Sequence, residues 1–87
     1  MSTEMHQTIA NYITQKILNQ PNRVLRMDQP LFSAGILDSL TIIDLALFVE
    51  STFGVKLKNS ELNDSVFDTV NELVALITRK QQNVKPR

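Results

Sequence analysis

The 87-residue sequence contains no cysteine, which excludes disulfide frameworks, cysteine-ligated metal centres and thiol nucleophiles. It has only two glycines and three prolines, and 43% of its residues are hydrophobic, so it is neither disordered nor collagen-like. No apolar run approaches the roughly 20 residues of a membrane span, and the N-terminus lacks the features of a secretory signal. We therefore expect a soluble, cytoplasmic, single domain at residues 1–82, followed by a frayed tail at 83–87.

A basic excess is also absent, because nine Lys and Arg balance nine Asp and Glu. Nucleic acid is therefore not an expected partner. The balance is uneven along the chain, since residues 31–54 contain Asp38, Asp44 and Glu50 but no Lys or Arg. Steps of six residues cannot bring these acids together on one helix face, so we expect no metal site. The acids instead predict a charged surface that a basic partner recognises.

Apolar spacing predicts an all-helical domain with three main helices and a short fourth one. The first helix covers about residues 3–18 and ends before Pro21, which cannot continue the hydrogen-bond ladder. The last main helix covers about residues 69–82, with Asp68 or Thr69 as its N-cap.

The second main helix is expected from about residue 39 to 52, with Asp38 as its N-cap and Gly54 just beyond its end. It is apolar around most of its circumference, which predicts a central position, exposed apolar residues for a partner, or both. An extended connector is expected at 55–58, followed by a short helical turn at about 59–64.

The segment at about residues 20–38 lacks helical spacing and contains Pro21, Pro30 and Gly35. It is nevertheless too apolar for a solvated linker, so we predict a long loop packed onto the domain. Loops longer than about 12–15 residues in a compact domain are usually functional. This directs attention to the end of the loop.

The loop ends by delivering Ser39 to the first turn of the second helix. Free backbone N–H groups and the positive end of the helix dipole are expected there, and both would stabilise a phosphoryl group on this serine. The alternative is that Asp38 and Ser39 only cap the helix.

A catalytic role for Ser39 is disfavoured. The Gly-x-Ser-x-Gly pattern of serine hydrolases is missing, since Leu37 and Thr41 occupy the glycine positions. The sole histidine, His6, lies at the start of the first helix and is expected to be a surface residue. We therefore predict no catalytic residue.

Several short stretches together resemble the acyl carrier protein family, in which the serine of an Asp-Ser-Leu motif carries covalent 4′-phosphopantetheine. The resemblance covers about residues 5–80. It implies an acyl-carrier-protein-like four-helix bundle with a long first loop. The stretches are LFSAGILDSL at 31–40, Asp44-Leu45, Glu50 and Phe53-Gly54-Val55.

The resemblance implies that Ser39 is the attachment site and that Asp38 is the acidic neighbour used by the phosphopantetheinyl transferase. It also implies that a partner-facing side of the second helix carries Leu40, Asp44, Leu47 and Glu50. Alternatively, the two acids belong to an ordinary solvated helix face and Leu47 to the core.

The subfamily follows from two further features. A neutral chain with Lys56 and Lys58 differs from strongly acidic fatty-acid carriers, and Ile36-Leu37 replaces the glycine-containing pair of nonribosomal-peptide carriers. Residues 60–71 are similar to discrete D-alanyl carrier proteins, although Phe67 replaces their tryptophan and Val70 their proline.

We therefore expect a monomeric, non-catalytic carrier protein that holds a short acyl or aminoacyl group as a thioester. It would receive the group from an adenylate-forming ligase and deliver it to downstream acyl-accepting enzymes. The short cargo is favoured because the core, including Phe48, Phe53 and Phe67, is expected to be well filled. The alternative from a different class is an unmodified helical adaptor that binds a partner through its second helix.

Overall fold

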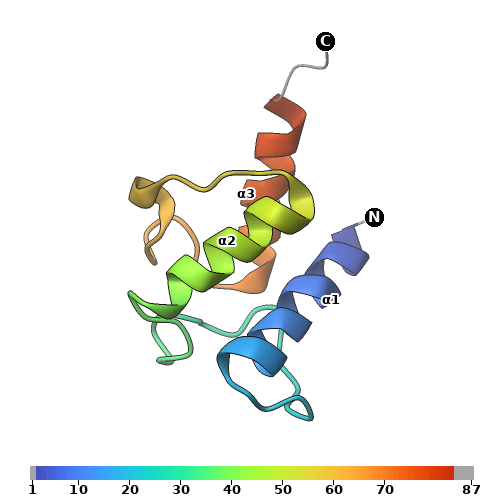
Figure 1. Cartoon of the computed structure of the whole chain (residues 1–87), viewed down its shortest axis with the longest axis vertical. Helices are drawn as coiled ribbons and strands as arrows, with labels where there is room; N and C mark the ends of the chain where they lie inside the picture. Colours follow the sequence, from blue (N-terminus) through green and yellow to red (C-terminus); the bar gives the residue numbers. More distant parts are fainter. Residues whose placement is uncertain (1, 84–87) are drawn as a thin grey trace.

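The computed structural model describes residues 2–83 and contains helices and loops but no strand in that range. The main helices are α1 (Ser2–Tyr12), α2 (Thr41–Phe53) and α3 (Val70–Asn83). The short elements are the π-helix η1 (Ile13–Ile17), which continues α1, and the 3-10 helix η2 (Asn59–Glu61). The predicted all-helical bundle with three main helices is confirmed (Figure 1). No helix within residues 2–83 is long and apolar enough to cross a membrane.

The core forms where the apolar faces of the helices meet. α1 packs against α3, and η1 packs against α2, which crosses in front of α3 in Figure 1. Burial of these faces is the main source of stability in a domain without disulfides. The largest fully buried side chains are Ile9, Ile13, Leu31, Leu45, Val49, Phe67, Val70, Leu73 and Ile77.

The first helix ends close to the predicted residue 18, but its last turn has an unexpected geometry. Its last turn is a π-helix, in which the Leu18 N–H donates to the Ile13 carbonyl at 2.8 Å. The chain then leaves the helix through Asn19, whose φ of 54° lies in the left-handed region that asparagine tolerates better than most residues. The helix therefore ends at Ile17, with Leu18 as its C-cap, and Asn19 turns the chain away before Pro21.

The long loop is packed against the domain, as predicted, and one aspartate holds it there. The Asp68 carboxylate accepts the N–H groups of Leu31 at 3.1 Å and Phe32 at 2.6 Å, and the Ser33 hydroxyl at 2.9 Å. The Asp68 carbonyl accepts the Leu31 N–H as well, at 2.6 Å. We call this set of contacts the Asp68 clamp. It joins the loop to the start of α3.

The clamp decides between the two predicted N-caps of α3. The Thr69 hydroxyl accepts the Glu72 N–H at 3.0 Å, so Thr69 is the side-chain cap. Glu72 in turn accepts the Asp68 N–H at 2.7 Å. The prediction that Asp68 could cap the helix is wrong, because its carboxylate is occupied by the loop.

The connector after α2 is fixed by a second acidic residue. Glu61 accepts the Lys58 N–H at 2.8 Å and pairs with the Lys80 ammonium of α3 at 2.8 Å. Partial burial would raise the pKa of Glu61, but the hydrogen bond from Lys80, with further help from Lys58, outweighs it and lowers the pKa. The ionised pair therefore holds η2, which ends at Glu61 and not at the predicted residue 64, against α3.

Candidate functional site

Ser39 is exposed because the loop turns sharply just before it. The N–H groups of Ile36 and Leu37 both donate to the Leu31 carbonyl, at 2.8 and 3.0 Å. Gly35 makes this turn possible with a φ of 78°, a conformation that glycine adopts without strain. The turn buries Ile36 and Leu37 in the core and leaves the next three residues, 38–40, exposed.

The predicted Asp38 cap is present at the entrance to α2. One carboxylate oxygen, Oδ1, accepts the N–H groups of Leu40 and Thr41, each at 2.9 Å. The Thr41 hydroxyl accepts the Asp38 N–H in return at 2.8 Å, which is the reciprocal pattern of a capping box. The α-helix begins at Thr41, two residues later than predicted, and the Ile42 N–H donates to the Asp38 carbonyl at 2.9 Å in the α-helical pattern.

This cap corrects one sequence-based expectation about Ser39. Free backbone N–H groups were expected at this helix start, but the Asp38 carboxylate occupies those of Leu40 and Thr41. Those backbone and hydroxyl donors lower the pKa of Asp38, so the residue is ionised at neutral pH. The helix start therefore places a fixed negative charge next to Ser39, and not a set of vacant donors.

The Ser39 hydroxyl itself has no hydrogen-bond partner among residues 2–83. It is therefore open to modification without breaking an existing contact, and its position suits a group attached through a phosphodiester. His6 lines a shallow hollow beside α3 with Asn71 and Arg79. No metal-binding cluster of His, Asp or Glu occurs in the described part of the chain.

The exposed side of α2 carries an apolar stripe. Leu40, Ile43 and Leu47 are 76%, 51% and 60% exposed, and their spacing places them on one side of the helix. The core contact considered for Leu47 is therefore wrong. Ile43 was not predicted as a surface residue, although its i, i+3, i+7 spacing with the two leucines carries the signal.

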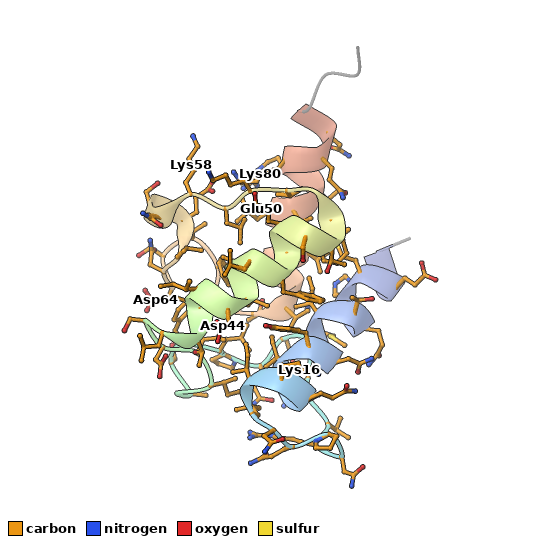
Figure 2. The ribbon with its side chains drawn as sticks, in the orientation of Figure 1. Lys16, Asp44, Glu50, Lys58, Asp64 and Lys80 are labelled. Carbon is orange, nitrogen blue, oxygen red and sulfur yellow. The ribbon has the colours of Figure 1, made fainter. Side chains whose placement is uncertain are left out.

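The two predicted acids of α2 are exposed, but they flank opposite sides of this stripe. Asp44 faces α1, whose Tyr12 hydroxyl lies 3.4 Å from the Asp44 carbonyl. Glu50 lines a groove of about 220 Å³ between α2 and the connector, opposite Lys56. The acids therefore do not form one compact patch (Figure 2).

The cap yields a testable prediction. Replacing Asp38 with alanine should speed amide hydrogen exchange at Leu40 and Thr41, since both lose their acceptor. Exchange measured by NMR in the Asp38→Ala and Asp64→Ala variants checks this, because Asp64 is exposed and makes no hydrogen bond among residues 2–83. Equal protection of both amides in the two variants would contradict the capping role.

Comparisons with known proteins agree with this geometry. The family described as "Phosphopantetheine attachment site" matches residues 7–77. The D-alanyl carrier proteins of Streptococcus pyogenes serotype M5 (strain Manfredo) and serotype M1 are 44% identical to this chain over 48 residues. That match spans 55% of this chain and 61% of those proteins, which is less than two thirds of their length.

A solved structure is also similar. A chain in "Crystal structure of FAD-dependent dehydrogenase" superposes with a TM-score of 0.71 and 34% sequence identity. The superposition covers 78% of this chain and 96% of that chain, so that chain is shorter than this one.

Proposed function

The chain belongs to the phosphopantetheine attachment-site family, and on that premise we propose that it is a discrete acyl or aminoacyl carrier protein modified on Ser39. The cofactor of this family is covalently attached 4′-phosphopantetheine. The observation that carries the assignment to Ser39 is its exposed hydroxyl, which is free of hydrogen bonds within residues 2–83 and follows directly after the capped Asp38.

Loading requires little of the chain beyond the position of this hydroxyl. Ser39 Oγ forms a bond to the β-phosphorus of coenzyme A and releases its proton, while the bond to the leaving 3′,5′-bisphosphorylated adenosine breaks. In this proposal the transferase supplies the base, since no described residue of this chain hydrogen-bonds to the Ser39 hydroxyl. Asp38 stays ionised in its cap and offers a fixed negative charge to the transferase or its Mg²⁺.

The attached group supplies a terminal thiol that holds the cargo as a thioester, so the chemistry resides in the cofactor. The chain is therefore a carrier without a catalytic site of its own. The rigid turn at Ser39 anchors the arm, and the exposed stripe Leu40, Ile43 and Leu47 offers the contact for each enzyme in turn. We propose a monomer that works in the cytoplasm, where the transferase and coenzyme A act.

Two similarities suggest the enzymes that act on the cargo. The D-alanyl carrier relatives support an aminoacyl cargo supplied by an adenylate-forming ligase. The similar chain belongs to a crystal structure of a FAD-dependent dehydrogenase, so a flavin-dependent dehydrogenase is one class of downstream enzyme to assay. The first suggestion is tested by incubating the phosphopantetheine-bearing protein with D-alanine, ATP and a D-alanine-activating ligase. Intact mass then shows whether an alanyl group is added.

The modification itself is tested by intact mass after incubation with coenzyme A, Mg²⁺ and a broad-specificity phosphopantetheinyl transferase. We expect one phosphopantetheine increment, which peptide fragmentation should assign to Ser39. The rival function is an unmodified adaptor, favoured by the exposed apolar stripe of α2. If the protein gains no mass but binds a partner through that stripe, the adaptor function is supported and the carrier function is excluded.

A further inference from the structure

The surface beside Ser39 carries free charges of both signs in separate places. In Figure 2, Asp44 lies on α2 and forms the acidic edge of this surface, Asp64 lies on the loop that follows η2, near the start of α2, and Lys58 lies above α2 on the connector. Within residues 2–83, none of these three residues makes an ion pair. Lys80, also labelled above α2, is neutralised by Glu61. Glu61 is the acid nearest to the connector and also interacts with the Lys58 charge, so Lys56 and Lys58 leave the connector with a net positive charge opposite the acidic edge.

A groove separates the two edges and joins them into one face. Its α2 wall includes Ile43, Leu47 and Glu50, and its connector wall includes Lys56 and Leu57. Glu50 and Lys56 do not pair across it in the described residues. The floor is apolar, and the rims carry opposite charges. This arrangement suits a partner that presents both signs, with an apolar side chain between them.

The whole face fits within one interface. α2 has 13 residues and is about 20 Å long at 1.5 Å per residue. A standard protein interface covers roughly 800 Å² on each partner, or about 30 Å across. An enzyme seated on Ser39 can therefore contact both the acidic edge of α2 and the lysines of the connector at once.

We infer that this two-signed face, formed by the stripe, Asp44 on one side and Lys56 and Lys58 on the other, sets the orientation in which the phosphopantetheinyl transferase docks. The inference rests on the proposed function. An acidic helix alone attracts a basic partner but leaves its rotation about Ser39 weakly defined. A second charge beside the helix removes that freedom, because a rotated partner would place like charges together.

The docking orientation matters more for the transferase than for the other partners. It must hold the Ser39 hydroxyl in its own active site, whereas later enzymes act at the end of a flexible arm. Small errors in orientation therefore cost it more rate. Its docking surface should carry a basic region facing Asp38 and Asp44 and an acidic region facing Lys56 and Lys58.

Two charge reversals of opposite sign test the inference through the kinetics of phosphopantetheine transfer. Asp44→Lys and the double variant Lys56→Glu/Lys58→Glu should each raise the KM for the carrier roughly tenfold with little change in kcat. The difference from wild type should shrink to about twofold or less in 0.5 M salt, since these charges are exposed. Thermal unfolding of each variant verifies that the fold is retained.

The matched control is Lys16→Glu/Arg79→Glu, which changes the net charge by the same amount as the connector variant. Lys16 is exposed on η1 and Arg79 on α3, away from the groove. This control should keep the wild-type KM. A connector variant with a KM equal to or below that of wild type would contradict the role of the two-signed face, and so would an equal rise in the KM of the control. Loading of Ser39 would be unaffected by either result. If wild type gains no phosphopantetheine, the proposed function fails and the inference fails with it.

Discussion

Replacing Ser39 with alanine is expected to abolish phosphopantetheine loading completely. The hydroxyl oxygen is the atom that bonds to phosphorus, and alanine has no substitute for it. The fold should be unaffected, because the hydroxyl is exposed and makes no hydrogen bond in residues 2–83. The free energy of unfolding should stay within about 0.5 kcal/mol of wild type. Intact mass and urea unfolding measured on the same preparation check both parts.

A second serine provides the matched control for this experiment. Ser60 lies on η2 and its side chain is exposed, so Ser60→Ala should load like wild type. Loading that survives in Ser39→Ala would place the attachment site on another residue. Loss of loading in both variants would indicate a general effect of serine substitution on recognition by the transferase, and not a specific need for the Ser39 hydroxyl.

Local patterns explain why so much of this site could be predicted from sequence. The Asp38 cap depends on residues within three positions of each other, and its hydrogen bonds to Leu40 and Thr41 follow from the way a helix begins. The same holds for the left-handed Gly54 that ends α2. In each case the residue type and its place relative to the apolar pattern determine the local structure.

Contacts between distant residues explain what could not be predicted. Asp68 was one of two expected N-caps of the last helix, the other being Thr69, but it binds Leu31, Phe32 and Ser33, which lie 35 to 37 residues earlier. The occupied donors beside Ser39 were missed for a different reason. A cap was predicted, but its consequence, that the same N–H groups cannot also serve a phosphoryl group, requires knowing which donors the carboxylate reaches.

Replacing Asp68 with alanine is expected to lower the free energy of unfolding by about 2 kcal/mol, because the loop loses a charged acceptor shared by several donors. The loop also delivers Ser39, so its release should slow phosphopantetheine transfer as well. Urea unfolding and transfer kinetics of the same variant measure the two effects. Asp64→Ala is the control, since Asp64 is exposed and lies outside the clamp.

The pH dependence of stability gives the clamp a separate signature. Partial burial would raise the pKa of Asp68 above its ordinary 3.8, but the donors from Ser33, Phe32 and Leu31 outweigh it and lower the pKa. A carboxylate whose pKa is lowered in the folded state contributes its full stabilisation of the fold at pH values above its own pKa in the unfolded chain. That contribution is lost as the pH falls through the folded-state value.

The isosteric variant Asp68→Asn isolates this contribution from the other carboxylates. Asparagine keeps one acceptor oxygen but replaces the other with an NH₂ group, which cannot accept the Ser33 hydroxyl. The difference in unfolding free energy between wild type and Asp68→Asn should be constant above about pH 5 and shrink below about pH 4. A difference that does not change between pH 7 and 3 would mean that the ionised carboxylate does not hold the loop, and the slowed transfer expected for Asp68→Ala would then need another cause.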